Sequence, residues 1–138
     1  MTVGLVMISN VVTVEMDDTL EDIRAIFQRA SFHHLLVGSE GKFAGVITEK
    51  DLWKAVSPYV GTLSETERDS ATLQKRAHQI MTRKHPTVTQ QTSIEDAAHM
   101  LLDKGISCLP VLSPDGMIEG IVTWKDIFRA LLGKVPTE

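Results

Sequence analysis

Two threonine–aspartate pairs are the residues with the clearest chemistry in this sequence. Thr48 and Asp51 lie three positions apart, and Thr123 and Asp126 repeat the pair further along the chain. If each threonine begins a helix, the aspartate occupies its third position, beside backbone N–H groups that lack partners in the first turn. Such a helix end attracts a phosphate, and an ionised aspartate accepts hydrogen bonds from both hydroxyls of a ribose. Together these groups suit a nucleotide.

The same spacing also has a purely structural interpretation. Thr19 with Asp22 and Ser93 with Asp96 show it too, and a hydroxyl followed by a carboxyl group three residues later is a common way of capping a helix. Helix capping alone explains any single copy. The repetition of the pair within a longer repeated pattern favours a binding role.

The two pairs belong to an internal repeat. Displacing the sequence by 74 residues places 93–96 on 19–22, and after one additional residue near Pro114 a displacement of 75 places 120–126 on 45–51. Each copy has roughly 50 residues, a size at which a lone unit rarely supports a core. We therefore expect the two copies to pack together.

Each copy is predicted to run strand, helix, strand, strand, helix. Short β-branched runs indicate the strands, apolar residues at helical spacing indicate the helices, and Gly- and Pro-containing turns separate the paired strands. The predicted strands are 11–14, 35–37, 44–47, 86–89, 109–112 and 118–122, and the helices follow Thr19, Thr48, Ser93 and Thr123. The helical positions expected in the core are Leu20, Ile23, Ile26, Phe27, Ala30, Leu52, Trp53, Val56, Ile94, Ala97, Ala98, Leu101, Leu102, Ile127, Phe128, Leu131 and Leu132.

The segment between the copies, residues 57–77, has no counterpart in the repeat. Pro58 is expected to break the preceding helix. Ser64 with Glu67 has capping-box spacing, which predicts a polar helix from about 65 to 76. We interpret this segment as a partly helical connector.

Composition excludes several classes of protein. The chain has 138 residues, of which 43% are hydrophobic, and a formal net charge of −4. This content argues against a largely disordered chain, and the acidic balance does not favour nucleic acid. No apolar run approaches the roughly 18 residues that span a bilayer, so no membrane association is predicted. The one cysteine, Cys108, fits a reducing, cytoplasmic location. No Walker loop or Gly-x-Ser-x-Gly elbow indicates an enzyme.

The ordered motifs resemble those of a tandem CBS-domain pair, also called a Bateman module. The first motif, present in both copies, consists of a glycine, two apolar residues, a threonine, two further residues and an aspartate. The others are the leading segments Val6–Ser9 and Ile80–Arg83 and the strand at Leu109–Val111. The likeness covers nearly the whole chain. It implies an α/β fold of two intertwined β-α-β-β-α units related by a pseudo-twofold axis. The corresponding divisions are a first CBS unit at 1–57, a connector at 58–77 and a second CBS unit at 78–135, forming one module.

The resemblance also implies a function. Such pairs commonly regulate rather than catalyse, and they bind adenosine-containing ligands such as AMP, ADP, ATP or S-adenosylmethionine in clefts between the units. It assigns the ribose to Asp51 and Asp126, and ribose or phosphate to Thr48 and Thr123. The residues that it implies as lining the clefts are Val12, Thr13, His33, His34, Pro86, Thr87, Ser107 and Cys108. No cofactor is expected to be required.

Two further expectations concern partners and the difference between the clefts. CBS pairs often dimerise through their helices, so a homodimer is expected, with a protein effector as a further partner. His33 and His34 stand where the second copy has Ser107 and Cys108, so the clefts should differ in size and polarity. Adjacent side chains in a strand point to opposite faces, which argues against a metal site at the two histidines. The alternative function is a ligand-free scaffold for dimerisation or protein interaction.

Overall fold

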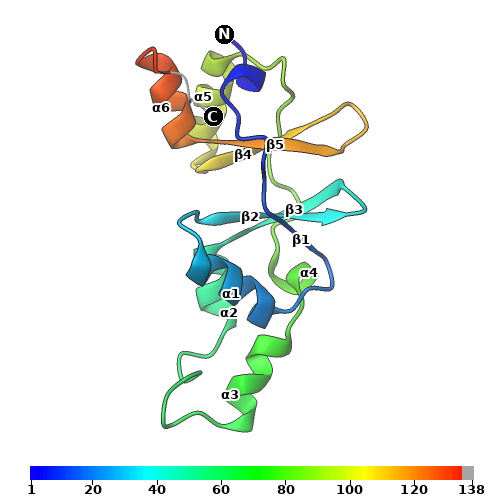
Figure 1. Ribbon diagram of the computed structural model, residues 1–138, viewed down its shortest axis with the longest axis vertical. Coiled ribbons are helices and arrows are strands. Elements are labelled where there is room, and N and C mark those ends of the chain that lie inside the picture. The colour runs from blue at the N-terminus through cyan, green and yellow to red at the C-terminus, as the bar shows by residue number, and fades with distance from the viewer. Residues whose placement is uncertain (135–138) are drawn as a thin grey trace. The chain divides into compact units, whose positions relative to one another are not determined.

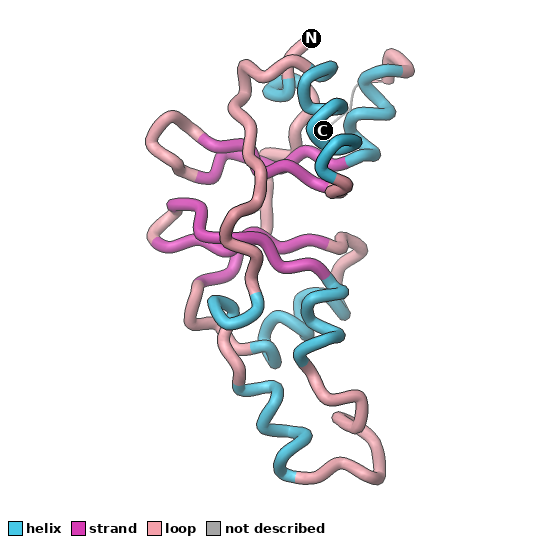
Figure 2. The backbone as a smooth tube through the Cα atoms, turned by 180° about the vertical axis from the view of Figure 1, so that it is seen from behind, coloured by secondary structure: helices cyan, strands magenta, loops and turns pink. Residues whose placement is uncertain are grey.

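The computed structural model describes residues 1–134, which form two compact α/β units (Figures 1 and 2). Unit 1 contains Met1–Val11, Gly41–Phe43 and the chain from His85 onward, and unit 2 contains Val12–Glu40 and Ala44–Lys84. The two units are built alike, as the repeat predicts. Residue 135, the last of the expected second CBS unit, lies outside the described residues.

Unit 2 is a three-stranded sheet with two helices on one side of it (Figure 1). Its elements are β1 (Thr13–Glu15), α1 (Leu20–Arg29), β2 (His34–Ser39), β3 (Lys42–Thr48), of which Lys42 and Phe43 belong to unit 1, and α2 (Glu49–Ala55). The strand order is β1-β2-β3, and β1 runs parallel to β2. Thr19 caps α1 by accepting a hydrogen bond from the Asp22 amide, as predicted. The buried side chains are those of Val14, Leu20, Ile23, Phe27, Leu35, Val37, Ile47, Leu52, Ala77 and Met81.

Unit 1 consists of a β-hairpin with two helices on one side of it (Figure 2). Its elements are the short 3₁₀ turn Val3–Leu5, α5 (Ile94–Lys104), the antiparallel strands β4 (Cys108–Leu112) and β5 (Ile118–Thr123), and α6 (Trp124–Leu131). Ser93 caps α5 through the Asp96 amide. The core contains Val3, Val6, Val88, Ile94, Ala97, Leu101, Leu109, Val111, Val122, Ile127 and Ala130. No helix within residues 1–134 has the length and apolarity to cross a membrane.

The prediction of a strand over residues 86–89 is wrong, because most of this segment forms no strand pairing. Only Val88 pairs, in parallel with Val111, donating to the Pro110 carbonyl and accepting from the Leu112 amide. Pro86 has no N–H to extend the pairing, and the Thr89 amide donates instead to the Thr92 hydroxyl. The first strand is shifted as well, since β1 begins at Thr13 rather than 11.

Five apolar helical positions predicted in the core are exposed. Each of these helices buries one stripe, and the exposed positions lie beside that stripe rather than on it. Thus Leu101 and Ile127 are buried, whereas their neighbours Leu102 and Phe128 face solvent. The exposed fractions are 63% for Leu102, 65% for Trp53, 55% for Phe128, 60% for Leu131 and 72% for Leu132.

The connector is helical over a shorter stretch than predicted and has a different cap. It forms α3 (Glu67–Ala71), a 3₁₀ turn at Thr72–Gln74 and then α4 (Ala77–Ile80). Thr66 with Asp69, not Ser64 with Glu67, makes the capping box. The Ser64 amide instead donates to the Thr62 hydroxyl, so Ser64 belongs to the preceding turn.

The leading segment of each copy pairs with the hairpin of the other copy. In unit 1, Ile8 and Ile121 exchange backbone hydrogen bonds of 2.8 and 2.9 Å. In unit 2, Thr82 and Val46 make the equivalent exchange at 2.9 and 3.1 Å. Each unit is therefore assembled from residues of both copies.

Candidate functional site

The first threonine–aspartate pair lies at the start of α2. The Thr48 hydroxyl accepts a hydrogen bond from the Asp51 amide at 3.2 Å, and Asp51 Oδ2 accepts one from the Thr48 amide at 2.9 Å. Both side chains are half-buried. We call this pair the first box. Its chemistry is that of a helix start carrying a hydroxyl and a carboxylate.

The second pair lies at the start of α6 and is more enclosed. Asp126 Oδ2 accepts from the Thr123 amide at 2.9 Å and from the Thr123 hydroxyl at 3.1 Å. The Asp126 residue is only 1% exposed, and Arg129 Nη1 lies 3.9 Å from its Oδ1. We call this pair the second box. The carboxylate of the second box thus has a guanidinium beside it, whereas the matching position after the first box is Lys54.

The residue after each threonine, Glu49 or Trp124, contacts the segment that precedes β2 or β4, respectively. In unit 2, Glu49 Oε1 lies 2.7 Å from His33 Nδ1, and the Glu49 amide donates to the His33 carbonyl. In unit 1, Trp124 Nε1 donates to the Ile106 carbonyl at 3.0 Å, and its ring stacks on Phe128 with centroids 5.6 Å apart. The first box therefore has a polar neighbour and the second an aromatic one.

The structure brings some predicted cleft residues next to their box. His33 meets the start of α2 through its backbone and ring, and His34 is the first residue of β2. Cys108 is paired with Thr123 in the β4–β5 register, and the Ser107 carbonyl accepts from the Trp124 amide at 3.4 Å.

The other four predicted lining residues lie on segments that do not carry a box. Thr13 is the first residue of β1 and Val12 precedes it, and β2 separates this strand from β3 and its box. Pro86 and Thr87 precede the Val88 bridge and are half-buried. A cleft-lining role stays a prediction for all eight residues.

Burial shifts the pKa of two groups in unit 1, one of which, Cys108, pairs with Thr123 of the second box. Burial raises the pKa of Cys108 to about 12, so this thiol stays protonated and has little nucleophilic character near neutral pH. Burial also lowers the pKa of His85, more than its hydrogen bond to the Pro86 carbonyl raises it. The Cys108 thiol therefore lacks the ionisation of an activated nucleophile.

Sequence reasoning missed the contact between Glu49 and His33 and the reason for the motif glycines. In the sequence, Glu49 and His33 are only a carboxylate and an imidazole within the first copy, and nothing indicates that they are in contact. Gly45 and Gly120 begin the two motifs, and a side chain there would collide with the paired leading segment, at 2.9 Å from the Thr82 carbonyl and 2.8 Å from the Ile8 carbonyl, respectively. The glycine repeated at the start of both motifs was the sequence signal for this close contact.

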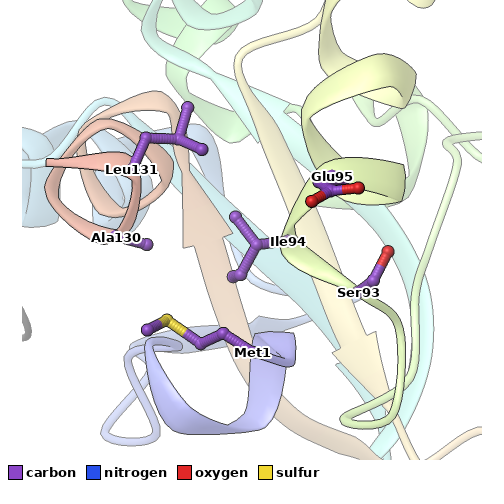
Figure 3. Close-up of a pocket in the computed structure, with 6 residues that line it drawn as sticks. All are labelled: Met1, Ser93, Ile94, Glu95, Ala130 and Leu131. Carbon is purple, nitrogen blue, oxygen red and sulfur yellow. The ribbon is translucent and has the colours of Figure 1, made fainter. Parts of the chain in front are cut away.

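A cavity in unit 1 lies at the opposite end of α6 from the second box. It has a volume of about 220 Å³ and is bounded by the start of α5 and the end of α6 (Figure 3). Its lining residues are Met1, Ser93, Ile94, Glu95, Ala130 and Leu131. None of the predicted site residues contributes to it.

The fold and the paired boxes define a tandem α/β repeat module with two helix-start sites. The sequence profile of the CBS domain matches residues 3–57 and 77–133. The chain therefore belongs to the CBS-domain family, as the motifs predicted.

Relatives place the module in proteins of different lengths. An uncharacterised 17.7 kDa protein of Acidianus ambivalens is 32% identical over 98 residues, which are 71% of this chain and 52% of that protein. A homoserine O-acetyltransferase of Methanosarcina acetivorans is 35% identical over 130 residues, covering 94% of this chain and 21% of the enzyme. The chain thus spans about half of the first relative and about a fifth of the second.

Solved structures show the same fold with ligands bound. The structure of CBSX2 in complex with AMP has a TM-score of 0.80 at 28% identity, covering 96% of both chains. The CBS-domain pair of protein MJ0100, in complex with 5-methylthioadenosine and S-adenosyl-L-methionine, has a TM-score of 0.77 at 25% identity, covering 96% of this chain and 97% of that one.

Proposed function

We propose that this chain is a non-catalytic regulatory module that binds an adenine nucleotide or another adenosyl compound at its two boxes. The observation that carries the proposal is the pair of helix starts with a threonine and an aspartate in matching geometry. The ligands of the similar structures, AMP in one and S-adenosylmethionine in the other, support the adenosyl class. Occupancy would be signalled by altered packing of the two CBS units.

The roles of the box residues follow from their chemistry. Asp51 and Asp126 would accept hydrogen bonds from the ribose hydroxyls, because an ionised carboxylate offers two acceptor oxygens. Thr48 and Thr123 would hold ribose or phosphate at a helix start, where backbone N–H groups favour negative charge. No cofactor is needed for this activity.

Isothermal titration with AMP, ADP, ATP and S-adenosylmethionine tests the proposal. We expect binding by the unmodified chain and a loss of about tenfold or more in affinity at the altered site in Asp51→Ala and Asp126→Ala, because each removes hydrogen bonds to a charged acceptor. Asp22→Ala and Asp96→Ala are matched controls, since they remove aspartates at the third position of α1 and α5. A folded chain that gives no heat with any of the four compounds would overturn the proposal.

The exposed apolar face of α6 favours the predicted homodimer and, without ligand, the alternative scaffold function. Phe128, Leu131 and Leu132 lie on this helix or directly after it and are 55–72% exposed. Contiguous exposed apolar residues commonly mark an interaction surface.

Sedimentation analysis checks this interface. We expect a dimer for the unmodified chain, a monomer for Leu131→Glu, and an unchanged dimer for Leu63→Glu, which alters a fully exposed leucine in the connector. A monomeric unmodified chain at micromolar concentration would contradict the homodimer. If the chain is a dimer and nucleotides leave its melting temperature unchanged, the scaffold becomes the better description.

The remaining predictions complete the proposed description. We retain the division into 1–57, 58–77 and 78–135, with a protein effector as the partner that responds to the ligand. The one cysteine supports a cytoplasmic location.

A further inference from the structure

The connector is attached to the C-terminal end of α2, the helix whose start forms the first box. Three hydrogen bonds make the attachment. The Ser57 amide donates to Thr72 Oγ1 at 3.0 Å, the Ser57 hydroxyl donates to Asp69 Oδ1 at 2.7 Å, and Lys75 Nζ donates to the Ala55 carbonyl at 3.1 Å. We call these three bonds the α2 anchor.

The residues of the anchor are themselves held in place. Asp69 Oδ2 accepts from the Thr66 amide at 2.9 Å, so one carboxylate caps α3 and receives Ser57. The hydrogen bond from Ser57, followed by that from the Thr66 amide, lowers the pKa of Asp69. The carboxylate therefore stays ionised and remains an acceptor at neutral pH.

The connector has a second attachment, to the start of α1. The Leu20 amide donates to the Lys75 carbonyl at 2.9 Å, and Arg76 Nη1 donates to the Asp17 carbonyl at 2.7 Å. Leu73 is buried. Although α3 stands away from the sheet (Figure 1), its chain is thus tied at both ends to the helices that cover the sheet of unit 2.

The length of α2 makes this attachment consequential. The helix has seven residues, Glu49–Ala55, and helices this short depend on tertiary contacts because nucleation is unfavourable. Its last carbonyls also require partners, and Lys75 supplies one to Ala55. Fraying from this end would reach Asp51 within about one turn.

The end of α6 is closed differently. Both helices have a local backbone bond at this end, from the Val56 amide to the Leu52 carbonyl in α2 and from the Leu132 amide to the Phe128 carbonyl in α6. Within the described residues, only α2 adds a bond from a distant side chain, that of Lys75. The second box thus serves as a comparison within the same chain.

We propose that the connector is a positioning element for the first box: by holding the C-terminal end of α2, Ser57, Asp69 and Thr72 set the ligand affinity of Asp51 without altering that of Asp126. This inference rests on the proposed nucleotide binding. By linkage, a ligand at the first box would in turn stabilise the connector.

The test combines hydrogen exchange with AMP titration. Ser57→Ala/Thr72→Val removes two bonds of the anchor, and we expect α2 amides to exchange about tenfold faster. In an Asp126→Ala background, which leaves the first box, the affinity for AMP should fall about tenfold. In an Asp51→Ala background, which leaves the second box, it should not change.

Two controls separate positioning from general damage. Thr62→Val removes a hydroxyl bonded only within the connector, to the Tyr59 carbonyl and the Ser64 amide, and should change neither readout. Ser57→Thr retains the hydroxyl and should preserve affinity.

Each result of the test has a distinct meaning. Unchanged α2 exchange, unchanged first-box affinity or equal weakening of both boxes overturns the inference. If the unmodified chain does not bind AMP, the proposal of AMP binding and the affinity part of this inference both fail. Hydrogen exchange of the α2 amides then still decides whether the anchor holds this helix.

Discussion

Replacing Gly120 with valine is expected to destabilise unit 1 by about 3 kcal/mol or more. A Cβ at this position would lie 2.8 Å from both the Ile8 carbonyl and the Met7 sulfur. The methionine side chain can move, but the Ile8 backbone is fixed by its two hydrogen bonds to Ile121. The substitution must therefore displace the leading segment from β5.

Denaturant unfolding followed by tryptophan fluorescence measures this effect. Trp124 reports on unit 1 and Trp53 on unit 2, so the experiment is best done in a Trp53→Phe background. Gly116→Ala is a useful comparison, since no atom lies within 4 Å of its added Cβ and its φ is +83°. It should cost about 1 kcal/mol through the left-handed backbone alone.

A second variant identifies the contact that limits the substitution. If the backbone contact dominates, adding Met7→Ala to Gly120→Val will recover little of the lost stability. Full recovery would mean that the sulfur contact, rather than the Ile8 carbonyl, requires the glycine.

Replacing Leu101 with alanine should lower the free energy of unfolding of unit 1 by about 2–5 kcal/mol. Leu101 lies in the middle of α5 with none of its surface exposed, within the cluster that includes Leu109 and Val122. Its removal leaves a cavity that the surrounding hairpin and helices fill only in part.

The neighbouring leucine is a matched control for that substitution. Leu102→Ala changes the same side chain on the same helix but at 63% exposure, and should cost less than about 0.5 kcal/mol in a dilute sample. Chemical denaturation of both variants checks the contrast. Similar losses at the two positions would contradict the burial pattern of α5.

The repeated motifs and helical periodicity predicted the α/β class, the helix starts and both boxes. They failed where apolar type alone was used to infer burial. Trp53 and Phe128 have hydrophobic side chains at plausible helical positions, but each short helix buries only a narrow stripe. Propensity likewise favoured a strand at 86–89, although Pro86 limits its pairing.

Contacts between distant segments were less predictable than local structure. No local signal indicated that Ile8 pairs with Ile121 or that the Ser57 hydroxyl reaches Asp69. The glycines at the start of each motif required a close neighbour without identifying it. The anchor also depends on the cap being at Thr66, where sequence spacing favoured Ser64.

The pairing of each leading segment with the other copy has a consequence for synthesis of the chain. All segments of unit 2 are available once Lys84 has emerged from the ribosome. Unit 1 also requires β5, so Met1–Val11 has no strand to pair with until β5 has emerged. Because domains fold as their residues emerge, unit 2 should form first, with the N-terminal segment kept unpaired. A ribosome stalled after Lys84 has emerged, but before β5 has, would therefore carry a folded unit 2 and an N-terminal segment without its partner strand.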